Sequence, residues 1–167
     1  MKRNGGFTLV EVLVAIAVIA VLVSMAATSF ARLLDRIRLT TTTNEFIAAL
    51  HGTRSRAVRD AAVVVLCPSS DGQSCDNAAF FADGWLITTD TSDTTATLRA
   101  WPAPGTNVTA NYPGDGYVRF GADGLPRQSS GAFLAGTARF CTGGQGRKVI
   151  LSRNGRIRTE GYDCASP

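Results

Sequence analysis

The stretch that decides the fold is Gly5-Gly6-Phe7-Thr8-Leu9-Val10-Glu11, which joins a short basic leader (Met1–Asn4) to a long apolar run (Val12–Phe30). As a helix at about 1.5 Å per residue, the segment from Phe7 to Phe30 would measure about 36 Å, enough to cross a hydrocarbon layer about 30 Å thick. It carries one carboxylate, Glu11, near its start. An ionisable group inside a bilayer costs at least ~2.5 kcal/mol, so we expect Glu11 to have a function.

Two other kinds of N-terminal segment fit this stretch less well. A secretory signal peptide has an apolar core of roughly 7–15 residues and a small-residue cleavage site beyond it. Ser29-Phe30-Ala31 could supply such a site, but the apolar run from Phe7 is longer than that core and contains a carboxylate. A plain membrane anchor has the required length but gives Glu11 no role.

The pattern Gly6-Phe7-Thr8-Leu9-x-Glu11, opening an uninterrupted apolar helix, resembles the prepilin signature of type IV pilins and of the pseudopilins of type II secretion. The resemblance implies that a prepilin peptidase cleaves between Gly6 and Phe7 and that Phe7 becomes the N-methylated N-terminus. Glu11 would then be the fifth mature residue, whose carboxylate is thought in this family to attract the N-terminal amine of a neighbouring subunit. Leaving the bacterial inner membrane, the subunit would enter a pilus or pseudopilus.

This resemblance also predicts the domain organisation. Residues 1–6 would be the leader, and residues 7–30 the transmembrane and assembly half of a long helix. Residues 31–167 would form a periplasmic globular domain that includes the amphipathic half of that helix. The membrane pass would be single, with the C-terminal domain in the periplasm.

The pattern beyond the apolar run predicts an α+β domain. No proline precedes Pro68, so a helix can continue without a proline break from Phe7 to about Arg59. Its apolar residues recur at three- and four-residue spacing, as in an amphipathic helix: Phe46, Ile47, Leu50, Ala57, Val58 and Ala61. Short stretches of β pattern follow, at residues 62–67, 84–90, 96–101, 117–120 and 137–141, and residues 102–116 are expected to form a long loop. We expect the strands to pack on the C-terminal half of the helix, which is the type IV pilin fold that the resemblance implies.

The four cysteines indicate disulfides, because an exported protein enters an oxidising compartment. Cys67 and Cys75 have seven residues between them and Cys141 and Cys164 have twenty-two, and no CxxC occurs, so the spacing is unlike that of a zinc site. Of the three pairings that four cysteines allow, we favour Cys67–Cys75 with Cys141–Cys164, because each closes a local loop.

Positive charge is concentrated near the C-terminus. The chain's formal net charge of +4 is modest, but no acidic residue lies between Asp123 and Glu160, and this segment contains Arg147, Lys148, Arg153, Arg156 and Arg158. Asn154-Gly155 strongly favours a two-residue type I′ hairpin. Such a turn would place Arg153 opposite Arg156, with Arg158 on the same face. Like charges directly opposite are unfavourable, so we expect an anion between them, and arginine suits phosphate oxygens.

Gly155-Arg156-Ile157-Arg158 matches the GRxR motif near the C-terminus of FimT-type minor pilins, members of the GspH/FimT family. There the motif is implicated in DNA binding for natural transformation. The resemblance implies a minor pilin that binds double-stranded DNA through its basic hairpin: Arg147, Lys148, Arg153, Gly155, Arg156 and Arg158. Because no aromatic residue lies between Gln145 and Thr159, we expect phosphate contacts rather than base stacking.

Two alternatives to DNA binding remain open. The protein could be a type II secretion pseudopilin, acting as a structural tip or priming subunit without nucleic acid. The hairpin could also have a purely structural role. Its basic side chains would then be solvated, while the apolar residues Ile150, Leu151 and Ile157 would pack against the rest of the domain. A further basic group, Arg54, Arg56 and Arg59, is expected near other pilins or at the helix–sheet junction.

Nothing in the sequence indicates an enzyme. The single histidine, His51, lies in the predicted helix, and neither a Gly-x-Ser-x-Gly elbow nor a phosphate-binding P-loop occurs. We therefore expect no catalytic residue, no cofactor and no metal. The expected partners are other pilins or pseudopilins, the prepilin peptidase, the inner membrane and double-stranded DNA.

Overall fold

The computed structural model describes residues 8–76, 80–89, 97–105, 107–112, 116–142 and 144–164. The chain divides into two compact units, Met1–Asp35 and Arg36–Pro167. A single 52-residue helix, α1 (Leu9–Asp60), begins in the first unit and ends in the second. The predicted unbroken helix is thereby confirmed.

Helix α1 begins with a side-chain cap. The Thr8 hydroxyl accepts a hydrogen bond from the Glu11 backbone N–H at 3.3 Å, which satisfies one of the first amides of the helix. Glu11 lies in the first turn, where a negative charge is favourable beside the helix dipole. The large apolar side chains of the first unit, from Leu9 to Val23, are all exposed.

Within the part of the chain that the structure describes, no helix offers an apolar stretch of the length needed to cross a membrane.

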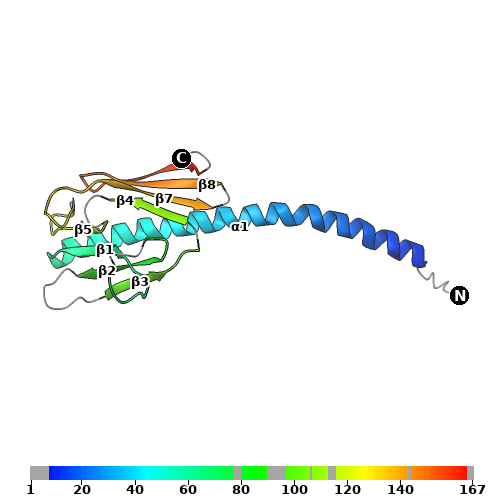
Figure 1. Ribbon diagram of the computed structural model, residues 1–167, viewed down its shortest axis with the longest axis horizontal. Coiled ribbons are helices and arrows are strands. Elements are labelled where there is room, and N and C mark those ends of the chain that lie inside the picture. The colour runs from blue at the N-terminus through cyan, green and yellow to red at the C-terminus, as the bar shows by residue number, and fades with distance from the viewer. Residues whose placement is uncertain are drawn as a thin grey trace. The chain divides into compact units, whose positions relative to one another are not determined.

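The second unit contains two antiparallel sheets. The first has the order β3 (Thr97–Pro102), β2 (Gly84–Thr89), β1 (Val64–Pro68), β5 (Val118–Phe120), β6 (Pro126–Arg127). The second has the order β4 (Asn107–Asn111), β7 (Gly136–Thr142), β8 (Gln145–Leu151), β9 (Ile157–Asp163). Figure 1 shows β7 and β8 along one side of the C-terminal half of α1, and β1, β2 and β3 along the other. The α+β prediction is confirmed, whereas the predicted loop at residues 102–116 is wrong because it contains β4.

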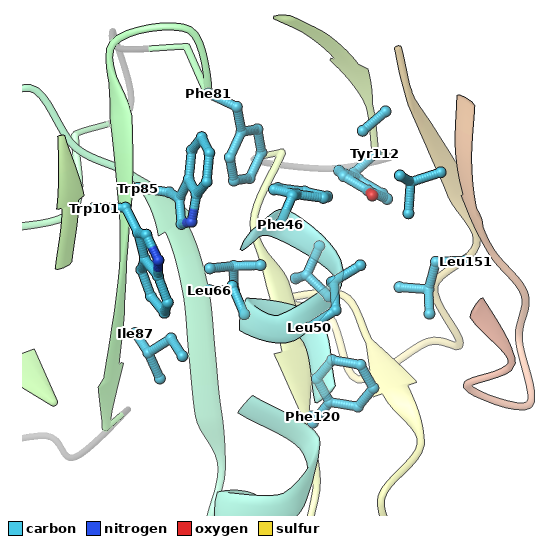
Figure 2. Close-up of a cluster of buried hydrophobic side chains, with 14 of the residues drawn as sticks. Phe46, Leu50, Leu66, Phe81, Trp85, Ile87, Trp101, Tyr112, Phe120 and Leu151 are labelled. Atoms are coloured by element: carbon cyan, nitrogen blue, oxygen red, sulfur yellow. The ribbon is translucent and has the colours of Figure 1, made fainter. Parts of the chain in front are cut away.

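The C-terminal half of α1 forms the centre of the hydrophobic core (Figure 2). The Phe46 ring contacts Phe81, Trp85 and Phe140, with ring centroids 5.1–5.5 Å apart. Leu50 and Ala57 are fully buried on the same side of the helix, as predicted. Two members of the predicted stripe are not buried: Val58 is exposed, and exposed Ala61 lies beyond the helix end with φ +49°.

Both predicted disulfides are present, Cys67–Cys75 and Cys141–Cys164. Cys67 belongs to a second buried cluster, with Val65, Leu86 and Tyr117. Cys141 lies on β7 and Cys164 follows β9, so their bridge crosses the intervening strand β8. The strand has Gly146 at the position paired with Cys141, and a Cβ atom there would collide with Cys164 Sγ.

Candidate functional site

The N-terminal site falls partly outside the described residues. Gly6 and Phe7, the predicted cleavage and methylation positions, lie outside them. Glu11 is exposed in the first turn of α1, next to the exposed apolar side chains that begin at Leu9. Sequence reasoning gave Glu11 a role in assembly only. The structure shows that its backbone N–H also completes the Thr8 cap, and Thr8-x-x-Glu11 is the capping-box pattern from which this could have been recognised.

The turn between β8 and β9 differs from the predicted type I′ hairpin. The Gly155 N–H donates to the Ser152 carbonyl at 2.8 Å, and the Ser152 N–H donates to the Arg156 carbonyl at 3.0 Å. Gly155 has φ +75° while Asn154 does not adopt a positive φ, so the loop has three residues, with glycine at the left-handed position. Ser152, not Arg153, therefore lies opposite Arg156, and the expected pairing of Arg153 with Arg156 across the strands is wrong.

Arg54 on α1 holds this turn in place. Its guanidinium donates from Nη1 to the Gly155 carbonyl oxygen at 3.1 Å. A Cβ atom on Gly155 would lie 3.2 Å from Arg54 Cζ, and one on Gly124 would lie 3.2 Å from Arg54 Nε. Both glycines are buried and left-handed, so two turns from different parts of the chain pack closely on one arginine side chain.

The turn that contains Gly124 also contains a carboxylate, Asp123, whose partners lie in the same turn. The Asp123 carboxylate accepts a hydrogen bond from the Leu125 N–H at 3.1 Å and pairs with Arg127 at 2.5 Å. The Leu125 amide, followed by the Arg127 guanidinium, holds the pKa of Asp123 below its usual range. The carboxylate is thus charged at neutral pH and engaged within its own turn.

Three of the predicted DNA-contacting side chains are exposed at or next to the turn: Arg153, Arg156 and Arg158. None of them makes an ion pair with a carboxylate of the described residues. Ile157, between Arg156 and Arg158, packs against the hydrophobic core. Because side chains alternate along an extended chain, both flanking arginines lie on the opposite face from Ile157.

Lys148 lies on the side of the second sheet that points away from α1. Its strand neighbours Val149 and Leu151 are buried against the helix, and so are Ala138 and Phe140 on β7. The alternate positions therefore form what we call the outer face of this sheet, which contains Arg139, Lys148, Arg158, Glu160 and Tyr162. Lys148 pairs there with Glu160 at 3.9 Å.

Tyr162 brings a second cation to Lys148. The Lys148 ammonium lies 5.5 Å from the centre of the Tyr162 ring, and the Arg139 guanidinium lies 5.7 Å from it. Sequence reasoning missed Arg139, because it is on β7, outside the basic segment. It also found no aromatic residue in that segment, whereas the sheet register places Tyr162 opposite Gly146, beside the segment's first residues.

Arg147 does not join the other basic residues. It occupies the same face of β8 as Val149 and Leu151, toward α1. There it lines a groove of about 600 Å³ together with Arg36, Leu39 and Thr40 of α1 and Asp163 of β9. The predicted basic cluster is therefore divided between the two faces of the sheet.

The remaining candidates on α1 are accounted for individually. Arg54, Arg56 and Arg59 were predicted to lie near other pilins or at the helix–sheet junction. Arg54 lies at that junction, where it contacts the turn between β8 and β9. Arg56 and Arg59 both pair with Asp60, the latter at 3.6 Å, so they share one carboxylate. His51 is exposed on the helix, and the described residues contain no group of three or more side chains able to hold a metal ion.

Comparison with known proteins gives two sequence matches and two structural ones. The profile described as Type II transport protein GspH matches residues 42–155, and that of the Prokaryotic N-terminal methylation motif matches residues 1–27. Two crystal structures of the Pseudomonas aeruginosa type IV minor pilin FimU are similar at 23% identity, with TM-scores of 0.57 and 0.55. The first alignment covers 77% of this chain and 96% of FimU, and the second covers 75% and 99%. The search of curated proteins gave no match.

Proposed function

This chain belongs to the GspH family of pilin-like proteins and has the type IV pilin fold, and on that premise we propose that it is a minor pilin of the type IV pilus that binds DNA. It is a structural subunit rather than an enzyme. Its apolar N-terminal helix assembles with other pilins, and its C-terminal basic hairpin contacts duplex DNA during uptake in natural transformation.

The exposed N-terminal half of α1 supports the assembly part of the proposal. Large apolar side chains from Leu9 to Val23 are exposed in the isolated chain, and an extended exposed apolar surface marks a site of association with proteins or membranes. We propose that residues 7–30, including those outside the described residues, anchor the precursor in the inner membrane by a single pass. After cleavage at Gly6, the same surface packs on other subunits, with Glu11 attracting the N-terminal amine of a neighbour.

Processing provides the first test. Mass spectrometry of the mature protein should find an N-methylated phenylalanine, Phe7, at the N-terminus. Replacement of Gly6 should leave the uncut precursor in the membrane, because the peptidase no longer recognises the junction. Glu11→Ala should be cleaved normally but enter filaments poorly. A mature N-terminus near Arg32 would contradict this part of the proposal.

One observation carries the DNA part of the proposal. Arg153, Arg156 and Arg158 are exposed and have no acidic partner among the described residues, and they lie at or next to a turn that Arg54 fixes to α1. These guanidinium groups, without a carboxylate partner in the described part of the chain, concentrate positive charge at one end of the sheet, and phosphate oxygens can accept their forked hydrogen bonds. Such contacts position DNA without reading its sequence.

Salt dependence tests this directly. If the three arginines each neutralise one phosphate, the logarithm of the DNA affinity should fall with log salt at a slope of about −2.7, and Arg156→Ala should reduce that slope by about 0.9. Arg156→Lys should restore only part of the affinity, because it keeps the charge but loses the fork. Arg99→Ala, which removes an exposed arginine from β3 of the other sheet, is the control and should change neither quantity.

A second function, that of a type II secretion pseudopilin, is favoured by the description of the matching family as a type II transport protein. In that function the hairpin is structural and no nucleic acid is bound. Absence of binding by the wild-type protein at low salt would favour the pseudopilin, as would unchanged binding by the Arg156→Ala, Arg158→Ala double variant.

A further inference from the structure

We propose that the DNA-binding surface is not limited to the hairpin but continues across the outer face of β7, β8 and β9, where Arg139 and Lys148 add two phosphate contacts. This inference rests on the proposed function and extends it. It assigns a binding role to Arg139, which lies outside the basic segment of the sequence, and gives none to Arg147, which lies inside it.

The sheet register brings these side chains together. Arg139 on β7 pairs with Lys148 on β8, and Lys148 pairs with Glu160 on β9. Arg158 is two residues from Glu160 along β9, so it lies on the same face, one row nearer the turn. Neighbouring strands are about 4.8 Å apart, so the cations from β7 to β9 span roughly 10 Å across the sheet.

The Tyr162 ring keeps Arg139 and Lys148 at their places on this face. Each cation lies within about 6 Å of the ring centre, the range of cation–π attraction. A single aromatic side chain from β9 therefore orders cations from two other strands. Cations ordered before binding lose less conformational freedom when a phosphate arrives, which favours affinity.

Lys148 remains available to a phosphate although it pairs with Glu160. The pair is long, at 3.9 Å, and half of the Glu160 side chain is exposed. Surface pairs of this kind contribute only about 0–1 kcal/mol, so a phosphate oxygen can replace the carboxylate at little cost.

Charge complementarity identifies the occupant as DNA. The hairpin and outer face together contain five cations, Arg139, Lys148, Arg153, Arg156 and Arg158, and one carboxylate, Glu160. That excess is as large as the formal net charge of the whole chain, +4. Each strand of a duplex presents one negative charge per about 3.4 Å of its axis, so a cationic surface extending roughly 10 Å meets several phosphates.

A pair of arginine variants tests the extension. Arg139 and Arg147 are both half-buried and lie on adjacent strands, but they face opposite sides of the sheet. Full-length mature protein in detergent is titrated with a labelled DNA duplex at several salt concentrations. With five phosphate contacts, the wild-type log–log salt slope should be about −4.5 rather than the roughly −2.7 expected for the hairpin alone. Arg139→Ala should weaken binding and reduce the slope by about 0.9, whereas Arg147→Ala should bind like the wild type with an unchanged slope. Tyr162→Leu, which removes the ring that orders both cations, should weaken binding, and Tyr162→Phe should not.

The outcomes separate this inference from the proposed function. If wild-type protein binds and Arg156→Ala weakens binding while Arg139→Ala does not, the hairpin is the site and the extension is wrong. If Arg147→Ala reduces the slope and Arg139→Ala does not, the ligand lies on the helix-facing side, which also overturns the extension. If wild-type protein does not bind at all, the proposed function itself fails. A circular-dichroism melt of each variant shows whether a loss of binding reflects unfolding.

Discussion

Gly155 illustrates how a residue of a short motif can act through packing rather than through contact with a ligand. It is buried, has φ +75°, and would place a Cβ atom only 3.2 Å from the Arg54 guanidinium carbon, closer than ordinary van der Waals contact. Arg156 and Arg158, which follow it in the motif, are exposed, while the hydrogen bond from Arg54 to Gly155 joins the turn to α1. In the GRxR motif of this chain, the glycine therefore positions the turn and Arg156 and Arg158 supply the charge.

Gly155→Ala should consequently destabilise the protein. A left-handed conformation costs a residue with a Cβ about 1–2 kcal/mol, and the tight contacts of that Cβ with Arg54 and the Gly124 carbonyl oxygen, each at 3.2 Å, add to that cost. Gly131→Ala is the matched control, because Gly131 has φ +82° but nothing lies within 4 Å of its Cβ position. Chemical denaturation should show a larger loss in the free energy of unfolding for Gly155→Ala than for Gly131→Ala. Equal losses would show that the contact with Arg54 contributes nothing.

At the scale of elements, strand β8 joins β9 to the rest of the second sheet. It pairs with β7 on one side and β9 on the other, and the Cys141–Cys164 bridge passes over it at Gly146. The bridge thus fastens the end of edge strand β9, which carries Arg158 and Tyr162, to β7. Gly146 leaves space for the bridge because it has no Cβ atom, although its backbone is not left-handed.

Replacing Gly146 by alanine should therefore disfavour the Cys141–Cys164 bridge. Thiol titration of the unfolded protein should detect two free thiols in a large fraction of Gly146→Ala molecules, and stability should fall by about 2–4 kcal/mol, as for loss of a disulfide. Gly161→Ala, on β9 of the same sheet with nothing within 4 Å of its Cβ position, serves as the control and should keep both bridges. Complete oxidation of Gly146→Ala at wild-type stability would refute this account of the crossing.

Local sequence signals predicted the elements better than the site. The proline-free first third indicated one helix, and the short loops between Cys67 and Cys75 and between Cys141 and Cys164 indicated the pairing. The turn type was missed because Asn-Gly suits both a type I′ turn and a three-residue loop with glycine at its end. The Arg54–Gly155 contact joins residues 101 positions apart, and Arg139 reaches Tyr162 only through the strand register, so no local pattern reveals either.

At the scale of the whole chain, two surfaces of different chemistry belong to the two compact units. Met1–Asp35 presents exposed apolar side chains on a helix, which suits association with other apolar helices. Arg36–Pro167 has its own core and carries the hairpin and the outer face, which suit a polyanion. The proposed function, that of a filament subunit that binds DNA, requires both surfaces.

The central claim, that DNA binds this basic face, is tested most directly at Lys148. Lys2 and Lys148 are the two lysines of the chain. Cleavage at Gly6, as proposed, would remove Lys2 and leave Lys148 as the only lysine side chain of the mature protein. Acetylation of the mature protein, followed by mass spectrometry with and without a saturating DNA duplex, measures its accessibility alone. The account predicts that DNA slows acetylation of Lys148 several-fold and that high salt abolishes this protection. An unchanged acetylation rate with DNA bound would contradict it.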